Sequence, residues 1–142
     1  MIKIQWLIFA ILSAVFVAMV SILSKIGLKN IDPTLATGVR SVVMFIFMVL
    51  VLLFTKKFPE LSALDKKSVF YIIFAGIAGA LSWIFYFIAL KLGKASQVAP
   101  IDKMSVVLII IFAALFLGEK FTLKIALGTL LLAAGTLLII LG

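Results

Sequence analysis

Residues 34–54 read TLATGVRSVVMFIFMVLVLLF, an apolar run that carries one charged residue, Arg40. A hydrocarbon core about 30 Å thick needs about 20 apolar residues in a helix that rises about 1.5 Å per residue. The run has this length and therefore predicts a transmembrane helix. Asp32-Pro33 comes directly before it and marks the helix start, because the carboxylate can cap free N–H groups and proline lacks only an N–H that would have no partner there.

Four further apolar runs of similar length fill most of the remaining sequence. Hydrophobic residues make up 66% of the chain and charged residues 13%, and most charges fall between the runs. This composition is typical of a chain solvated by lipid rather than of a soluble domain. We therefore predict an all-α integral membrane protein whose five transmembrane helices form one domain, residues 1–142. The helices are expected at residues 4–23, 34–54, 69–90, 95–117 and 121–141.

The first apolar run follows an N-terminal lysine, as the apolar segment of a secretory signal peptide does. It is long enough to span a bilayer and four more spans follow it, so we interpret it as a retained first helix. Only the connection at residues 55–68 is longer than about a dozen residues. The other connections are tight turns, which force neighbouring helices to be antiparallel and leave no room for an extramembrane domain.

Lysines between the spans carry the orientation signal, because loops rich in lysine and arginine stay in the cytoplasm. Face A is defined here as the side that bears the N-terminus, and face B as the other side. Face A carries Lys3, Lys56, Lys57, Lys66, Lys67, Lys120 and Lys124, and face B carries Lys25, Lys29, Lys91 and Lys94. This bias favours face A in the cytoplasm, but its margin is small enough that insertion in both orientations stays open.

The residue types that are missing exclude most kinds of active site. The chain has no cysteine and no histidine, which removes disulfides, Cys/His metal sites, thiol nucleophiles and imidazole bases. The formal net charge of +8 could indicate nucleic-acid binding, but the lysines sit singly or in pairs at the ends of apolar runs and form no basic stripe. We expect a partner in the lipid bilayer, no nucleic acid, no cofactor, no metal and no catalytic residue.

Three charged residues lie at membrane depth. Arg40 follows Pro33 by seven residues, about 11 Å along the helix, and Asp102 and Lys103 follow the start of the fourth run by a similar number. All three lie at nearly one level, close to the midplane, where a lone charge costs about 3 kcal/mol or more. We therefore predict that Asp102 pairs with Arg40 or with Lys103. A structural ion pair with one snorkelling cation and a role in substrate handling are both consistent with this pattern.

Aromatic residues gather on one face of the third run, also well below face B. Trp83, Tyr86 and Phe87 follow one another at helical spacing. Tryptophan usually collects at the membrane interface, so Trp83 is expected to pack against protein or to line a cavity. Such a stripe is more often packing than a binding site.

Several glycines and one proline indicate where helices bend, turn or meet. Pro100 lies inside the fourth run and predicts a kink or gating pivot just before Asp102. Gly118, with Glu119 beside it, suits the left-handed cap of a structural turn on face A. Small residues spaced four or seven apart predict close helix–helix seams, within one chain or between two; they are Ala75/Gly79, Gly76/Ala80 and Gly128/Gly135.

These residues carry a resemblance that covers nearly the whole chain. The stretches that carry it are LSKIGLK at 23–29, IDPTLAT at 31–37, YFIALKLGKAS at 86–96, VAPIDKMS at 98–105 and LGE at 117–119. They resemble the EamA-domain branch of the drug/metabolite transporter superfamily, in particular its single-repeat, five-helix bacterial and archaeal members.

The resemblance implies two five-helix repeats of opposite orientation around a central path, usually for export of small metabolites or drugs across the cell membrane. This chain has one repeat and an odd number of spans, so an antiparallel homodimer would complete the pair. The positions that match the family's motifs become candidates for substrate handling, gating or turns: Lys25, Arg40, Tyr86, Pro100, Asp102, Lys103 and Glu119.

The leading hypothesis is a secondary transporter that alternates access around a central cavity. Asp102 would accept a proton or pair with cations, Arg40 and Lys103 would hold polar substrate groups, and Trp83 and Tyr86 would flank the small-molecule substrate. The alternative is a non-transporting structural or regulatory subunit that pairs with another membrane protein in one fixed orientation. An enzyme is disfavoured because the sequence has no nucleophile–base pair, metal cluster or phosphate loop.

Overall fold

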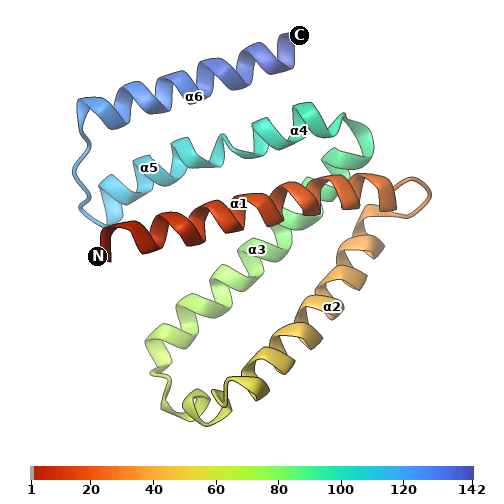
Figure 1. Cartoon of the computed structure of the whole chain (residues 1–142), viewed down its shortest axis with the longest axis vertical. Coiled ribbons are helices and arrows are strands. Elements are labelled where there is room, and N and C mark those ends of the chain that lie inside the picture. The colour runs from red at the N-terminus through yellow and green to blue at the C-terminus, as the bar shows by residue number, and fades with distance from the viewer. Residues whose placement is uncertain (1) are drawn as a thin grey trace. The chain divides into compact units, whose positions relative to one another are not determined.

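The computed structural model describes the backbone of residues 2–142 and the side chains of residues 5–142, so the side chain of Lys3 lies outside the described part. The elements are α1 (Ile2–Gly27), α2 (Pro33–Phe54), η1 (Phe58–Ala63), α3 (Lys66–Leu92), α4 (Ala95–Asp102), α5 (Ser105–Phe116) and α6 (Leu123–Leu141) (Figure 1). Within the described residues five stretches are long and apolar enough to cross a membrane, with α4 and α5 together forming the fourth. The prediction of a helical membrane protein with five spans is confirmed.

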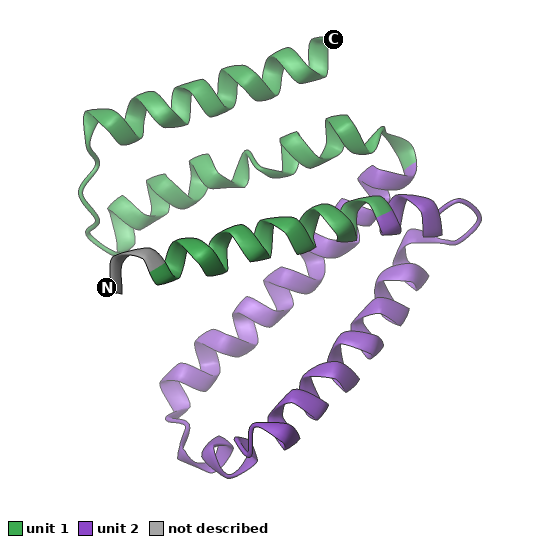
Figure 2. Ribbon diagram, in the orientation of Figure 1, with its two compact units in different colours: residues 1–22, 92–142 green, residues 23–91 purple. Residues whose placement is uncertain are grey.

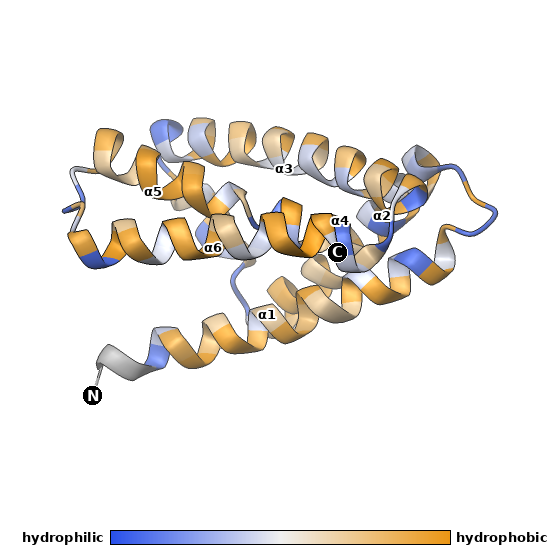
Figure 3. Ribbon diagram, turned by 90° about the horizontal axis from the view of Figure 1, so that it is seen from above, coloured by the Kyte–Doolittle hydropathy of each residue, from blue (hydrophilic) through white to orange (hydrophobic). Residues whose placement is uncertain are grey.

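The spans are apolar along their length rather than on one face only. Figure 3 shows hydrophobic residues over most of each helix and hydrophilic residues mainly near helix ends and in the connections. Large apolar side chains stay exposed, as Phe54 at 85% and Phe85 at 67% illustrate. A soluble protein could not leave so much apolar surface in water, whereas lipid solvates it directly.

The chain forms two compact units, shown in separate colours in Figure 2. Unit 1 contains Met1–Ile22 and Leu92–Gly142, and unit 2 contains Leu23–Lys91. In unit 1, α6 packs against both α4 and α5. Unit 2 holds the end of α1 together with α2, η1 and α3.

The start of α2 follows the capping pattern expected from its sequence. Asp32 accepts hydrogen bonds from the backbone N–H groups of Thr34 and Leu35 at 2.9 and 3.0 Å, and proline occupies the first turn. Further along, the Thr37 hydroxyl donates to the carbonyl of Pro33 at 2.8 Å. The Thr37 hydroxyl and the first N–H groups of α2 thus have hydrogen-bond partners within the protein and need no water, as a membrane span requires.

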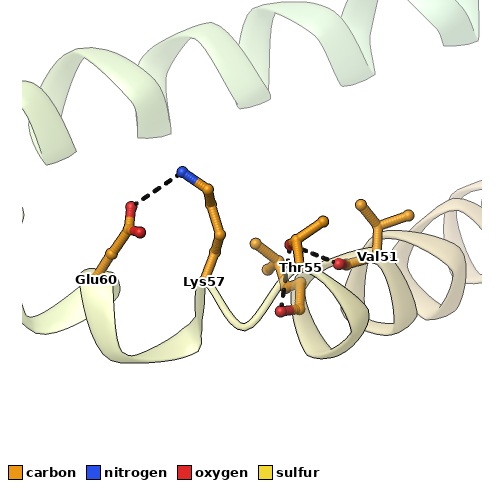
Figure 4. Close-up of polar contacts among 5 residues, drawn as sticks. Val51, Thr55, Lys57 and Glu60 are labelled. Carbon is orange, nitrogen blue, oxygen red and sulfur yellow. Dashed lines mark hydrogen bonds and ion pairs between the residues drawn. The ribbon is translucent and has the colours of Figure 1, made fainter.

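The connection between α2 and α3 is more ordered than the predicted loop. The Thr55 hydroxyl donates to the carbonyl of Val51 at 2.7 Å, and Lys57 forms an exposed ion pair with Glu60 at 3.4 Å at the start of η1 (Figure 4). Lys56 has a φ of 55°, a left-handed conformation that few residues other than glycine adopt. This conformation ends α2 and turns the chain toward η1.

Two helices extend beyond the apolar runs from which they were inferred. α3 begins at Lys66 rather than at residue 69, because Asp65 accepts a hydrogen bond from the Ser68 N–H at 3.0 Å and caps the first turn. α1 continues to Gly27 rather than ending at residue 23. Apolar runs mark the part of a helix in the hydrocarbon, and the helix itself continues into the interface.

The fourth span differs from the continuous, kinked helix expected at Pro100. Pro100 lies inside α4, which ends at Asp102, and α5 starts anew at Ser105. Between them the backbone bonds tighten, with the Met104 N–H donating to the Ile101 carbonyl at 2.9 Å. Proline cannot donate to the carbonyl four residues before it, so the last turn of α4 is weakened and the chain continues into a tighter, 3₁₀-type turn before α5.

Candidate functional site

A stacked arginine occupies the middle of the candidate site in unit 2. The guanidinium carbon of Arg40, on α2, lies 3.7 Å from the ring centroid of Trp83, on α3. The ring of Phe87 is 5.9 Å from the same carbon. Arg40 and Trp83 are both half-buried. A cation over an indole face at this distance is a strong cation–π geometry, and it stabilises a charge that cannot reach water easily.

The aromatic residues behind Trp83 hold its ring in place. Tyr86 packs edge-on against it with centroids 5.5 Å apart, and Phe87 does so at 5.9 Å. Tyr86 and Phe87 are buried, at 9% and 3% exposure. The predicted aromatic stripe on one helical face is confirmed, with Arg40 as the group that it supports.

Two lysines join the C-terminal ends of α1 and α3 in unit 2. The ammonium group of Lys25 donates to the backbone carbonyl of Leu90. In return Lys91 donates to the carbonyls of Leu28, Lys29 and Ile31, at 2.6, 3.0 and 3.2 Å. The last carbonyls of a helix have no partner within it and carry the negative end of its dipole, so each lysine caps the other helix.

Lys25 was predicted as a site residue, whereas Lys91 was not. The usable signal was the position of Lys91 in the last turn of its helix, where a cation complements the dipole. Its acceptors are more than fifty residues away in the sequence, so no local pattern identifies them. A pocket of about 180 Å³ lies at this junction, lined by Lys25, Leu28, Lys29, Leu90 and Lys91.

Asp102 and Lys103 lie at the interruption of the fourth span, in unit 1. Asp102 is the last residue of α4 and Lys103 caps that helix. Lys103 Nζ lies 3.4 Å from Asp102 Oδ2, and the two side chains are 51% and 37% exposed. Of the two pairings predicted for Asp102, the structure has the one with Lys103.

The site residues therefore fall into two groups, one in each unit. Unit 2 brings Arg40 together with Trp83 and Tyr86, and places Lys25 at the α1–α3 junction. Unit 1 brings Asp102 together with Lys103. The predicted pairing of Arg40 with Asp102 stays a prediction.

The turn on face A has the conformation that its glycine predicted. Gly118 has a φ of 68°, and the N–H of Glu119 donates back to the carbonyl of Ala113 at 3.2 Å. Glu119 also lines a small pocket of about 90 Å³ beside the turn, together with residues of α5 and α6. This geometry closes α5 and directs the chain toward α6.

Comparison with known proteins identifies the family. Residues 4–141 match the EamA-like transporter family. The chain belongs to this family. It is therefore a multi-pass membrane transporter of the EamA type, as the motif stretches at 23–37 and 86–105 predicted.

Two relatives align along almost their whole length with this EamA protein. One is described as an uncharacterized transporter in the cobO 3′ region of a Sinorhizobium species; it is 39% identical over 135 residues, which cover 95% of this chain and 96% of the relative. The other is an uncharacterized protein of Methanocaldococcus jannaschii, 27% identical over 133 residues, or 94% of each chain. No solved structure matches the chain.

Proposed function

We propose that this EamA protein is a secondary transporter that moves a small metabolite or drug across the cell membrane by alternating access. The observation that carries the proposal is the interruption of the fourth span directly after Asp102. The residues between α4 and α5 form a 3₁₀-type turn, and a stretch of 3₁₀ turns inside a helix often marks a functional hinge. In secondary transporters such interruptions lie beside the substrate and coupling-ion sites.

Asp102 is the proposed coupling group. Its carboxylate lies at the C-terminal end of α4, where the negative end of the helix dipole favours a cation or a proton. Lys103 neutralises it in the resting state at 3.4 Å and is released when a proton or substrate takes its place. Pro100 weakens the last turn before this point and thereby allows α4 to move separately from α5.

Arg40, Trp83 and Tyr86 form the proposed substrate wall. Arg40 offers hydrogen-bond donors near the membrane centre, Trp83 supports its guanidinium, and buried Tyr86 packs edge-on against the Trp83 ring. Lys25 lies at the α1–α3 junction and is assigned here to holding that end of the bundle together rather than to direct substrate contact.

An antiparallel homodimer completes the proposed transporter. A single five-span repeat places its termini on opposite faces, so an inverted second copy supplies the other half of an inverted-repeat path. Relatives in a bacterium and an archaeon favour the plasma membrane as the location.

Transport by reconstituted vesicles tests the coupling role. Asp102→Asn keeps the size of the side chain and removes its charge, and Asp65→Asn makes the same change in the connection outside the spans. We expect Asp102→Asn to abolish uptake driven by a pH gradient, while Asp65→Asn transports like the wild type. Undiminished, pH-dependent transport by Asp102→Asn would remove Asp102 from the mechanism.

Orientation distinguishes the transporter from a structural subunit. The excess of lysine on face A favours one fixed orientation, which is what a non-transporting subunit paired with another membrane protein would have. Cysteines engineered at the two termini should each react with an impermeant reagent from both sides of the membrane if the homodimer is antiparallel. Labelling of each terminus from one side only favours the subunit.

A further inference from the structure

The Arg40 guanidinium has a supported face and unused hydrogen-bond donors. Its face rests on the Trp83 ring at 3.7 Å. Within the described residues of unit 2 its N–H groups make no hydrogen bond or ion pair. None of these nitrogens is a fully buried, unsatisfied atom, so they remain accessible to a ligand. A guanidinium has five donors in a planar fork, and the fork matches two oxygens of one anion.

The carboxylates of unit 2 are engaged away from Arg40. Asp32 caps α2, Asp65 caps α3, and Glu60 pairs with Lys57 in the connection. Each of them lies outside a spanning segment, whereas Arg40 lies seven residues inside α2, about 11 Å from its start. The anion that would balance Arg40 therefore does not come from unit 2.

The arrangement selects against a cationic ligand. Aromatic faces bind organic cations, but the Trp83 face is already taken by Arg40. A second cation placed there would meet a like charge in a medium of low dielectric constant, where repulsion is strong. Tyr86 and Phe87 are buried against Trp83, at 9% and 3% exposure, so the half-buried Arg40–Trp83 pair is the part of this cluster that a ligand can reach.

We propose that Arg40, held on Trp83, binds the carboxylate of a small organic monoanion whose apolar or aromatic body lies beside the half-buried Arg40–Trp83 pair. This rests on the proposed transport function and names the substrate class of the same site. A single cation balances a single negative charge. A dianion would carry a second charge into the hydrocarbon without a partner in unit 2, at a cost of several kcal/mol.

The aromatic support gives the site its geometry. Trp83 packs edge-on against both Tyr86 and Phe87, and these contacts restrict rotation of the ring under Arg40. A preorganised guanidinium loses little entropy when it binds. Lysine in place of Arg40 would keep the charge and lose both the fork and the flat stacking surface, so it tests geometry separately from charge.

Fluorescence of Trp83 measures binding directly. The chain has two tryptophans, and Trp6 is 66% exposed on α1, so Trp6→Phe leaves Trp83 as the one reporter. Detergent-solubilised Trp6→Phe protein is titrated with phenylacetate, with its neutral isostere phenylacetamide and with the cation phenethylamine. We expect phenylacetate to bind at least about tenfold more tightly than the other two, the value of one charge-assisted hydrogen bond. Equal binding of phenylacetate and phenylacetamide by this folded protein overturns the proposal.

Variants of Arg40 assign the effect to its side chain. In the Trp6→Phe background, Arg40→Gln should bind phenylacetate and phenylacetamide alike, and Arg40→Lys should lose several-fold in phenylacetate affinity. Lys29→Gln removes the same charge from an exposed position in unit 2 and should leave affinity unchanged. An Arg40→Gln protein that still prefers phenylacetate overturns the proposal. If Arg40→Gln does not fold, the ligand comparison with Arg40 intact decides.

Vesicle counterflow separates this proposal from the proposed transport function. Vesicles loaded with unlabelled phenylacetate are assayed for uptake of the labelled anion. Carboxylate binding without counterflow supports the anion site and contradicts transport of such substrates. Counterflow of a cationic compound, with no preference for phenylacetate, supports transport and overturns the substrate class named here.

Discussion

Lys25 and Lys91 stand in a reciprocal relationship: each lies in the last turn of one helix and donates to the backbone at the end of the other. Lys25, on α1, donates to the Leu90 carbonyl, and Lys91, on α3, donates to three carbonyls that follow α1. Leu28 and Leu90, which supply two of these carbonyls, are buried to 1% and 0% exposure. The two lysines thus neutralise two negative helix ends that would otherwise repel each other.

Lys91→Met should lower the stability of the detergent-solubilised protein by about 2 kcal/mol, because carbonyls that Lys91 now binds lose a charged donor. Lys94→Met removes an exposed lysine three residues further along the chain and should change stability by less than about 0.5 kcal/mol. Apparent melting temperatures of the two variants provide the comparison. A Lys91→Met protein as stable as Lys94→Met would mean that the interhelical cap has no net value.

Trp83→Leu should destabilise the protein by about 1–2 kcal/mol more than Phe85→Leu does. Both substitutions remove an aromatic ring from α3, but only Trp83 supports a cation and packs against two rings. Phe85 is 67% exposed. Thermal unfolding in the same detergent measures the difference, and equal losses would argue that the Arg40 stacking contributes nothing to stability.

Gly118→Ala should cost about 1 kcal/mol of stability. Gly118 has a φ of 68°, which a side chain with Cβ adopts only under strain, although a Cβ there would meet no other atom within 4 Å. Gly128→Ala is the control, because Gly128 lies inside α6 with equally open surroundings, and alanine favours a helix there. The two variants should therefore shift the melting temperature in opposite directions. If Gly118→Ala leaves the melting temperature unchanged, the turn can accommodate a side chain at this position without strain.

Acid should weaken the first turn of α3 through Asp65. The Ser68 side chain and backbone N–H groups donate to this carboxylate, and these hydrogen bonds hold the pKa of Asp65 below its usual value of 3.8. A depressed pKa contributes stability above the unfolded value, and this contribution is lost as the pH falls through the folded value. Asp65→Asn keeps a capping oxygen that does not titrate.

Stability measured between about pH 5 and pH 2 should therefore fall less steeply for Asp65→Asn than for the wild type. If stability depends on pH in Asp65→Asn as it does in the wild type, groups other than Asp65 cause the loss of stability in acid.

Local chemistry made several features predictable from the sequence. The cap at Asp32, the left-handed Gly118 and the aromatic stripe at Trp83 and Tyr86 each depend on residues within one or two turns of one another. The motif stretches predicted the EamA family, and residues 4–141 match it. The interruption after Asp102 was harder to predict, since Pro100 marks a weakened turn but not the residue at which the helix stops.

By itself the sequence determined that the chain crosses a membrane and how many spans it has, because the length and hydropathy of each run must match the bilayer. Only the tertiary structure decided which groups meet across those spans. The stacking of Arg40 on Trp83 joins residues more than forty positions apart. The hydrogen bonds from Lys25 and Lys91 to backbone carbonyls at the end of the other helix do so as well. The physical reason is that a charge held away from water pairs with the donor, acceptor or ring that helix packing places at the same depth. Sequence spacing does not encode which group that is.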